Sequence, residues 1–437
     1  DHGLVYLDEG RFKKVGLDAY QSPPSISEIS EGPEGNLWVG MGAGLFRLSP
    51  RTIQGYTRAD GLPADLIFPI LQDGEGAVWM GTNGGGLHRL ANGRTDGPTT
   101  TITSADGLLG NAVYSLHESR GGGVWVGVRG SVARVAGNSV EERHSLGRQG
   151  GRIRALYEDE RGRVWVGRQD LFLIDEDSVR RHGPPLLRRG NVSIRGIHED
   201  QSGTVWVTTK EGLFRKDDGE WHRFTTEDGL PSNFLLSVHE EADGTLWFTT
   251  HGAGLVRYLG DGKFFTYTTA DGLHSNGIWQ ILEDDQGYFW MSSNTGISRV
   301  QKQALERLRR GTIDRVSSRV FTMADGMPSS ECAHTQPAGW KTQDGRLWFP
   351  TIKGAAIVDP DNVPAAGQPP PVRLQQVRVD GRPVDWRTTD VLTPGRNTLA
   401  FHYAALSFSA PERSRYRYKL EGYDETWQQA GARRAAF

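Results

Sequence analysis

The sequence predicts an all-β protein whose main part is a β-propeller of seven or eight four-stranded blades. Three observations support this prediction: a tryptophan recurs at intervals of 40 to 58 residues, a glycine stands three residues before each of these tryptophans, and short hydrophobic runs alternate with turn-forming residues. Glycine makes up 57 of 437 residues, nearly twice its usual share of ~7%. Many short strands joined by tight turns account for this excess, because glycine tolerates left-handed backbone.

Eight tryptophans mark eight copies of one sequence unit. They are Trp38, Trp79, Trp125, Trp165, Trp206, Trp247, Trp290 and Trp348. The glycines three residues earlier are Gly35, Gly76, Gly122, Gly162, Gly203, Gly244, Gly287 and Gly345. Eight glycines at one offset exceed what chance gives at this composition, so the unit is a repeat.

Each unit contains residues for four short strands. At the positions nine and twelve residues before the tryptophan, seven copies carry Ile, Val or Leu, and the copy of Trp348 breaks both columns. In the unit of Trp247, a third strand is predicted over 254–258 and a fourth over 264–269. Four strands per ~40 residues is the spacing of a propeller blade. Because radial packing buries both faces of a blade, the tryptophans predict blade-to-blade packing rather than a platform for carbohydrate.

Composition and motifs argue against several classes of function. Fifty basic and 53 acidic residues give a net charge of −3, so no basic surface for nucleic acid is expected. Cys332 is the only cysteine, which excludes an intrachain disulfide and a thiolate metal site. The Asp-rich turns at 217–219 and 284–287 lack the ligand spacing of a calcium loop, and no phosphate-binding or zinc motif occurs. No cofactor and no metal are therefore expected, and no apolar stretch reaches the ~20 residues that span a membrane.

The clearest copies share a second motif. Residues 228–233 read Asp-Gly-Leu-Pro-Ser-Asn and lead into the tryptophan strand at 243–250, and Asp-Gly-Leu or Asp-Gly-Met recurs at 60–62, 106–108, 271–273 and 325–327. Over nearly all of residues 1–360 the chain resembles the two-component regulator propeller repeat, which occurs in the sensory regions of bacterial hybrid histidine kinases and diguanylate cyclases. After the tryptophan strands of the Trp125 and Trp165 copies, before the next repeat tryptophan, no Asp-Gly-Leu element follows. The copy of Trp290 carries a charged insert over 301–310, for which we expect a helix.

We predict three segments: a propeller over 1–362, a proline-rich linker over 363–371 and a β-rich domain over 372–437. Residues 4–15 look like the last two strands of a unit, so either N-terminal strands close a ring with the final hairpin or the repeats come from a longer array. Residues 401–408 and 416–424, with Trp427, resemble the Y_Y_Y domain, an immunoglobulin-like β-sandwich that follows these propellers. The match ends before the last strands of such a sandwich, and the resemblance implies that a membrane helix and a cytoplasmic output module follow.

One face of the predicted propeller concentrates the sequence variation. In a four-stranded meander, the Asp-Gly-Leu elements and the loops after each tryptophan lie at the same end of the strands, around one mouth of the central channel. Four residues after and eleven residues before the tryptophan, polar and aromatic residues vary from copy to copy. Cationic side chains there suit an anionic or polyhydroxylated ligand and aromatic rings could stack on a sugar, while drift of unconstrained loop tips is the alternative. The candidate ligand-binding residues are Asn83, Arg129, Lys210, His251, Asn294, Tyr114, Arg154, Arg195 and Trp279.

A column of histidines is interpreted as structural. His117, His198 and His239 each stand eight residues before a repeat tryptophan, and Leu71 and Tyr157 take that position in other copies. A position that also accepts Leu does not require a metal ligand. No catalytic residues are predicted.

The leading hypothesis is that the chain is the periplasmic, ligand-sensing region of a membrane-bound bacterial signalling protein of the histidine kinase or diguanylate cyclase type. It would bind a small molecule or an oligosaccharide at the propeller mouth, or form a homodimer through the propeller rim, and pass the change through the sandwich. Contact with a membrane would come only through a segment outside this chain. Two alternatives stay open: a propeller enzyme, such as a polysaccharide lyase or glycosidase, and a protein–protein scaffold. The absence of Asp and Glu four residues after the tryptophans weighs against the enzyme.

Overall fold

The protein is built almost entirely of antiparallel strands, which confirms the predicted all-β fold. The computed structural model describes residues 4–8, 11–14, 25–32, 36–42, 44–48, 51–147, 151–176, 178–188, 192–363, 372–385, 387, 398–405, 416–430 and 434–436. The chain divides into two compact units. One unit is Arg51–Val363, and the other consists of Asp1–Pro50 and Pro364–Phe437.

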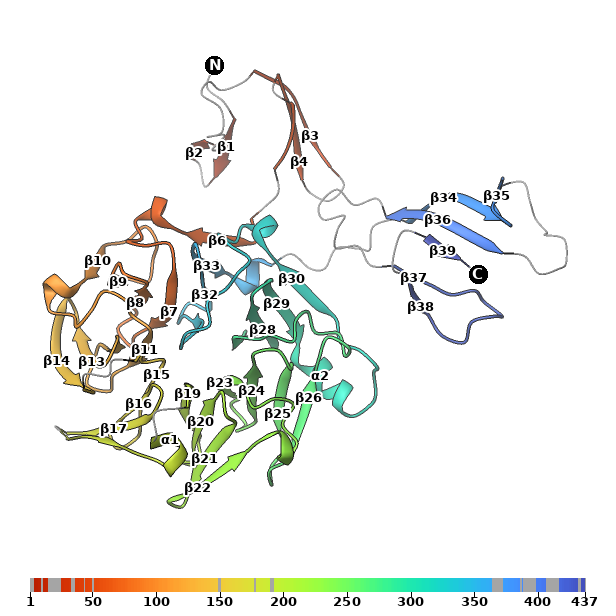
Figure 1. Ribbon diagram of the computed structural model, residues 1–437. Helices are drawn as coiled ribbons and strands as arrows, with labels where there is room; N and C mark the ends of the chain where they lie inside the picture. Colours follow the sequence, from red (N-terminus) through yellow and green to blue (C-terminus); the bar gives the residue numbers. More distant parts are fainter. Residues whose placement is uncertain are drawn as a thin grey trace. The chain divides into compact units, whose positions relative to one another are not determined.

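The unit Arg51–Val363 is a propeller of seven four-stranded antiparallel sheets arranged around a common axis (Figure 1). The innermost strands of neighbouring sheets contact one another, and the other strands follow outwards in chain order. Seven is one of the two predicted blade numbers. The ring begins at residue 51, whereas the sequence predicted a propeller domain over 1–362, because the copy of Trp38 forms a sheet of the other unit.

The blades are numbered here in chain order. Blades 1 to 3 consist of β7 (Ile67–Gln72), β8 (Val78–Thr82), β9 (Leu87–Leu90) and β10 (Thr99–Ile102); β11 (Ser115–Glu118), β12 (Val124–Gly127), β13 (Ser131–Ala136) and β14 (Ser139–Ser145); and β15 (Ala155–Glu158), β16 (Val164–Gly167), β17 (Leu171–Asp175) and β18 (Ser178–Arg181). Blades 4 and 5 consist of β19 (Ile194–Glu199), β20 (Val205–Thr209), β21 (Leu213–Asp217) and β22 (Glu220–Phe224); and β23 (Leu235–Glu240), β24 (Leu246–Thr250), β25 (Leu255–Tyr258) and β26 (Phe264–Tyr267). Blades 6 and 7 consist of β27 (Gln280–Glu283), β28 (Tyr288–Ser293), β29 (Gly296–Gln301) and β30 (Ser318–Phe321); and β31 (Trp340–Lys341), β32 (Leu347–Thr351), β33 (Gly354–Val358) and β6 (Ile53–Tyr56).

The ring closes through a strand from its N-terminal end. Strand β6 pairs antiparallel with β33, with Tyr56 opposite Ala355 and Ile53 opposite Val358, and so supplies the outermost strand of blade 7. Of the two alternatives for the end of the repeats, closure by an N-terminal strand is therefore observed within this unit. The closing strand is 53–56, not a strand of the segment 4–15.

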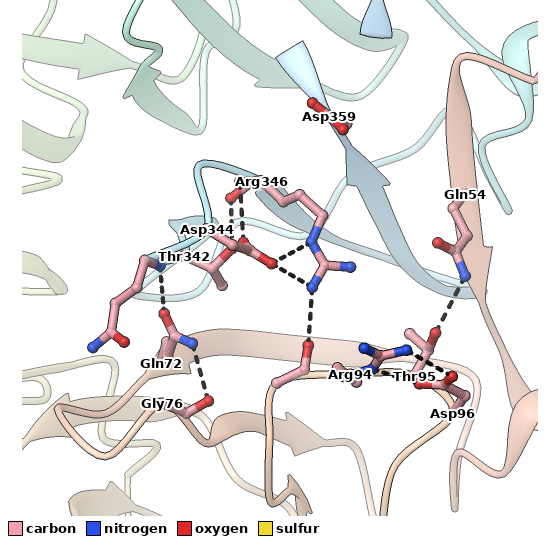
Figure 2. Close-up of polar contacts among 12 residues, drawn as sticks. Gln54, Gln72, Gly76, Arg94, Thr95, Asp96, Thr342, Asp344, Arg346 and Asp359 are labelled. Carbon is pink, nitrogen blue, oxygen red and sulfur yellow. Dashed lines mark hydrogen bonds and ion pairs between the residues drawn. The ribbon is translucent and has the colours of Figure 1, made fainter. Parts of the chain in front are cut away.

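Side-chain contacts seal the join between blade 7 and blade 1 (Figure 2). The backbone N–H of Gln343 donates to Oε1 of Gln72 at 2.7 Å, and Gln54 donates to the Thr95 hydroxyl at 3.2 Å. Arg346 donates to its neighbour Asp344 and to the carbonyl oxygen of Gly93 in blade 1. Two of these bonds join residues that lie 271 and 253 positions apart in the sequence.

The Asp-Gly-Leu motif is a capped turn that leads from one blade to the next. In the copy before blade 5, the backbone N–H and hydroxyl of Thr225 donate to the carboxylate of Asp228, at 2.8 and 3.0 Å. Gly229 then adopts φ +95°, which a residue with a side chain rarely tolerates, and Leu230 is buried. The same turn precedes blades 1, 2 and 7 as the short helices η1 (Arg58–Asp60), η2 (Ser104–Asp106) and η4 (Met323–Asp325), beside η3 (Thr226–Asp228) here.

The repeat tryptophans of the ring are buried, as predicted, and most of them also donate a hydrogen bond. Trp206 Nε1 donates to Asp200 at 2.7 Å, and this carboxylate stands six residues before the tryptophan, as it does in blades 1, 3, 5 and 6. Blade 2 carries Ser119 at that position, and Trp125 donates instead to Glu158 of blade 3. Blade 7 carries Thr342 there, and Trp348 Nε1 has no partner.

Two α-helices are found between strands in the described part of the ring. The insert expected to be helical over 301–310 forms α2 (Lys302–Arg309), and a short helix α1 (Pro185–Arg188) leads out of blade 3. A further short helix η5 (Pro360–Asn362) ends the ring.

The other unit contains four small sheets. They are the hairpin β1 (Val5–Asp8) and β2 (Arg11–Lys14); the sheet β3 (Ile26–Glu31), β4 (Leu37–Met41) and β5 (Gly44–Leu48); the sheet β34 (Val372–Val379), β35 (Arg382–Val384), β36 (Leu399–Ala405) and β39 (Arg434–Ala436); and the pair β37 (Tyr416–Tyr418) and β38 (Gln428–Ala430). Strands thus occur where the sequence predicted them around 4–15, 372–380, 397–408 and 414–420. The immunoglobulin-like arrangement stays a prediction, and residues 364–371 of the predicted linker lie outside the described part of the chain.

Candidate functional site

The inner strands give the channel of the propeller two distinct ends. In blade 4, Ile194 at the start of β19 pairs with Thr209, and Glu199 at its end pairs with Val205 next to the glycine turn. We call the end at which the inner strands begin the upper mouth and the end with the glycine turns the lower mouth. The predicted columns, eleven residues before and four after the tryptophan, therefore lie at the upper mouth, and the residues twelve and thirteen before it lie there as well.

Aromatic rings and cations interlock at the upper mouth. The rings of Phe234 and His251 are parallel, with their centroids 4.6 Å apart. Two cations also contact the Phe234 ring: the guanidinium carbon of Arg195 lies 5.1 Å and Nζ of Lys210 lies 4.9 Å from its centroid. His251 in turn contacts Trp279 at 5.4 Å. Cations and rings of blades 4 and 5 and a ring of blade 6 thus form one continuous group.

Two neighbouring contacts extend this group. Trp279 contacts His334, which precedes blade 7, at a centroid distance of 5.6 Å. On the side of blades 2 and 3, the Arg152 guanidinium lies 5.1 Å from the ring centroid of Tyr114. Arg154 interacts electrostatically with Arg152, Tyr114 and Arg195. We call the whole set the mouth cluster: Tyr114, Arg152, Arg154, Arg195, Lys210, Phe234, His251, Trp279 and His334.

The electrostatics show that these side chains converge on a shared space. The pKa of His334 is lowered by burial and then by the neighbouring Arg195, Arg154, His251 and Lys210, although the residue is exposed at the surface. His334 belongs to the segment before blade 7, whereas those four residues come from blades 3, 4 and 5. Residues from opposite parts of a ring influence one another in this way only if they approach its axis.

Burial and mutual repulsion make the cations of the cluster costly. Burial, followed by repulsion from Arg154, lowers the pKa of Arg195 to about 10. Arg154 itself has a lowered pKa because it is partly buried and lies beside Arg152. The pKa of His251 is lowered by burial, Arg195 and Lys210, so its imidazole is neutral at pH 7.

Two buried donors of the cluster lack a hydrogen-bond partner. Nε of Arg195 and Nε1 of Trp279 are both unpaired, and the two side chains are only 8% and 7% exposed. Buried donors of this kind are rare in native proteins and call for an explanation such as a ligand. In the part of the chain that the structure describes, no ion pair joins Arg154, Arg195 or Lys210 to a carboxylate.

Six of the nine candidate residues from the sequence belong to the mouth cluster: Tyr114, Arg154, Arg195, Lys210, His251 and Trp279. Arg129 adjoins it, because its backbone forms a bridge with Arg152. Asn83 and Asn294 are exposed and take no part in the described contacts of the cluster. Tyr114 and Trp279 are 5% and 7% exposed, so their rings support the neighbouring side chains and do not offer an open face to a sugar.

Three members of the cluster were not among the predicted residues. Arg152 and Phe234 stand 13 residues before their tryptophans, two residues before the predicted column at position 11. Because side chains two apart in a strand share a face, the period of two was the signal that could have found them. His334 lies in the copy that breaks the repeat, where no column assigns it a place.

The lower mouth has a structural role. Carboxylates at the ends of the inner strands accept backbone N–H groups from the preceding blade: Glu118 from Gly74 at 2.6 Å and Glu240 from Gln201 at 3.0 Å. Glu240 also accepts a hydrogen bond from His198 at 2.8 Å, and the histidine column is thereby explained as part of the inter-blade contacts.

Two cavities open at the lower mouth. They have volumes of about 400 and 470 Å³ and share Asp73, Glu118 and Trp340. A third cavity, of about 660 Å³, lies beside the glycine turns of blades 4 and 5, and no member of the mouth cluster lines any of the three. The two carboxylates that the first two cavities share already accept hydrogen bonds from other residues of the propeller: Asp73 accepts from Nε1 of Trp79, and Glu118 accepts from the backbone N–H of Gly74. We therefore place the candidate site at the upper mouth.

The described residues contain no group of three or more His, Cys, Asp or Glu side chains arranged to hold a metal ion. None of the helices they form is both long and apolar enough to cross a membrane.

Comparisons with known proteins identify the repeat. Residues 147–167 and 272–295 match the two component regulator propeller family, which confirms the repeat that the sequence resembled. The sequence matches none of the curated proteins.

Solved structures share the fold. The extracellular domain of the hybrid two-component system BT3049 from B. thetaiotaomicron aligns over 97% of this chain and 59% of its own, with 22% identity and a TM-score of 0.72. That of the one-component system BT4673 aligns over 100% and 61%, with 16% identity and a TM-score of 0.55. Virginiamycin B lyase from Staphylococcus aureus aligns over 70% of this chain and 97% of its own, with 14% identity and a TM-score of 0.51. This chain thus spans about three fifths of the two extracellular domains.

Proposed function

Because the chain carries two-component regulator propeller repeats, we propose that it is the extracytoplasmic ligand-sensing region of a membrane-bound bacterial signalling protein. It binds its signal at the upper mouth. The observation that carries this proposal is the convergence of cationic and aromatic side chains from blades 2 to 6, with His334, on one end of the channel. Extracellular domains of two-component systems with the same fold support the compartment and the sensing role.

The physical argument concerns the cost of the mouth cluster. Buried cations that repel one another and buried donors without partners both destabilise a fold. A ligand that accepts those hydrogen bonds offsets the cost, and stability is commonly given up in this way at binding sites. Most of the repeat tryptophans, by contrast, donate to a carboxylate of the ring.

Signal transmission follows from the chain order. The propeller precedes the strands β34 to β39, and we propose that these strands pass the ligand-induced change toward a membrane segment outside this chain. Analytical ultracentrifugation with and without ligand distinguishes this route from homodimerisation through the propeller rim.

The alternative of an enzyme has one observation in its favour. His251 has a lowered pKa and is therefore a neutral imidazole beside two cations, which is an arrangement able to accept a proton and stabilise the negative charge that results. The lyase neighbours show that a propeller of this kind can be an enzyme. Mass spectrometry of a bound ligand after long incubation distinguishes the two functions, because a sensor returns the ligand unchanged.

The test of the sensing function is a thermal-shift screen of the whole chain against oligosaccharides and small metabolites, followed by calorimetry of each ligand found. The double variant Arg195→Gln/Lys210→Gln should weaken binding at least tenfold. The control is Arg180→Gln, which removes an exposed arginine of strand β18 that pairs with Asp175. This variant should bind the ligand as tightly as the parent protein does. Ligands that bind equally well to all three proteins would place recognition elsewhere and contradict the proposal.

A further inference from the structure

We infer that the ligand of the upper mouth carries an oxyanion, a carboxylate, sulfate or phosphate group, which Arg154, Arg195 and Lys210 bind. This inference rests on the proposed function and specifies the ligand class for the same site.

The charge balance of the ring sets these three cations apart. Two other largely buried arginines of the ring are paired with carboxylates: Arg168 with Asp170 at 2.7 Å and Arg134 with Glu141 at 2.7 Å. Arg154, Arg195 and Lys210 form no such pair among the described residues. An oxyanion supplies the missing negative charge and accepts several N–H groups at once, which a guanidinium presents in a planar fork.

The positions of the cations define where the oxyanion binds. Arg195 and Lys210 lie 5.1 and 4.9 Å from the centroid of one ring, that of Phe234, so the two charges are neighbours. Arg154 stands eleven residues before the tryptophan of blade 3, as Arg195 does in the neighbouring blade 4, and the inner strands of these two blades contact each other. The charge of Arg154 also contributes to the lowered pKa of Arg195. Nε of Arg195, on a side chain that is more than nine-tenths buried, has no hydrogen-bond partner among the described residues.

The aromatic residues argue against recognition of a neutral sugar by stacking. Stacking needs an exposed ring face. The rings of Tyr114 and Trp279 are buried, and Phe234 is covered by His251 and by the two cations. These rings hold cations in place, and the group that they present to a ligand is positive charge.

The test compares matched ligands that differ only in charge. Trigalacturonate and its fully methyl-esterified form are titrated by calorimetry into the whole chain at low and at high salt, and sulfate and phosphate are titrated separately. We expect the acid to bind at least tenfold more tightly than the ester and to lose affinity with added salt, because the contact is between charges. Binding of sulfate or phosphate alone would also support the inference and would identify a free inorganic anion as a sufficient ligand.

Variants show where the anion binds. Lys210→Gln, at an exposed position, and Arg195→Gln should each reduce the affinity for the acid at least tenfold, and Arg180→Gln should leave it unchanged. Circular dichroism and the melting temperature of each variant confirm folding, and Lys210→Gln keeps the test valid if Arg195→Gln is unstable.

The outcomes separate this inference from the proposed function. If acid and ester bind equally and both are weakened by the variants, the mouth is a ligand site but the anion inference is overturned. If no anion binds, or if anion binding ignores both variants, the inference is again overturned. The proposed function then depends on whether any neutral ligand of the wider screen is sensitive to Arg195 and Lys210.

Discussion

The mouth cluster and the frame of the ring differ in how completely their hydrogen-bond donors are paired. By the frame we mean the repeat tryptophans, the carboxylates that hold them and the contacts of the closing seam. In the frame most donors are hydrogen-bonded. The Trp206 ring donates to Asp200, the backbone N–H of Gly74 donates to Glu118, and His88 shares a hydrogen bond with Tyr56. In the mouth cluster, Arg195 and Trp279 retain unpaired donors and the cations repel one another. Hydrogen bonds are therefore more completely formed in the frame, and we propose that the unpaired groups of the mouth bind an outside partner.

Repetition explains the difference. A carboxylate six residues before the tryptophan recurs in five of the seven blades, because every blade must solve the same packing problem. The residues of the upper mouth differ from blade to blade, as we expect if a single ligand meets each blade from a different direction, which is the function that we propose. Substitutions should separate these roles: changes in the frame should lower stability, and changes at the mouth should alter binding.

The largest effect is expected for Trp247→Ala. This substitution removes a large ring that is 2% exposed, together with its 2.6 Å hydrogen bond to Glu241, and should lower the free energy of unfolding by about 3–5 kcal/mol. Chemical denaturation measures the loss. Trp427→Ala, at a position that is 56% exposed, is the matched control and should change stability little. A small loss in Trp247→Ala would show that the tryptophans do not hold the blades together.

Acid should weaken the closing seam. His88 is fully buried, shares a hydrogen bond with Tyr56 of β6 at 3.2 Å, and has its pKa lowered by burial from 6.5 to about 4. The unfolded chain therefore binds a proton that the folded chain does not, and stability falls as the pH drops from about 6.5 to about 4. The loss for this group is about 3 kcal/mol. Denaturation midpoints measured between pH 7 and 5 should depend less steeply on pH in His88→Gln; an unchanged slope would refute this assignment.

A smaller loss is expected for Asp200→Thr, which gives blade 4 the residue type that blade 7 carries before Trp348. The carboxylate accepts from Trp206 Nε1 and from the backbone of Ser202 and Thr204, so its removal should cost about 2 kcal/mol. Asp217→Thr, at an exposed position of the same blade, is the control. Equal melting temperatures for the two variants would contradict the role given to this carboxylate.

The smallest expected change in the free energy of unfolding is an increase. Arg195→Met replaces a buried, repelled cation by an apolar side chain of similar length, and should raise the free energy of unfolding by about 1 kcal/mol. The same variant should lose ligand binding. If Arg195→Met is destabilised and still binds the ligand, the prediction is wrong, because Arg195 would then stabilise the ring as the residues of the frame do.

A second pair of regions shows how far local sequence determines structure. The strands β3 to β5 carry the repeat with its tryptophan, Trp38, and its Ile and Leu columns, yet Ile29, Leu37 and Leu45 are 49%, 43% and 68% exposed. At the same offsets in blade 4, the exposed fractions of Ile197, Val205 and Leu213 are 9%, 4% and 0%. The same pattern makes the same hairpin in both places, and only the presence of neighbouring blades buries its faces.

The candidate site was predicted in part for the same reason. The columns four residues after and eleven residues before the tryptophan led to Arg154, Arg195, Lys210 and His251, because strand geometry places those offsets at one end of each blade. His334 lies outside every column, and its contact with Trp279 depends on how the chain enters blade 7. The exposure of the rings also required the structure, since the sequence does not show which side chain covers which ring.

The sequence by itself determined the repeat, the strand order within each blade, the buried tryptophans and the end of the strands at which variable residues gather. All of these follow from contacts between residues fewer than about fifty positions apart. Only the tertiary structure decided that the ring has seven blades, that residues 53–56 close it against β33, and that cations of blades 3 and 4 meet without a carboxylate. Those features depend on pairing between distant segments, whose energy comes from burial and charge in the assembled ring and leaves no periodic trace in the chain.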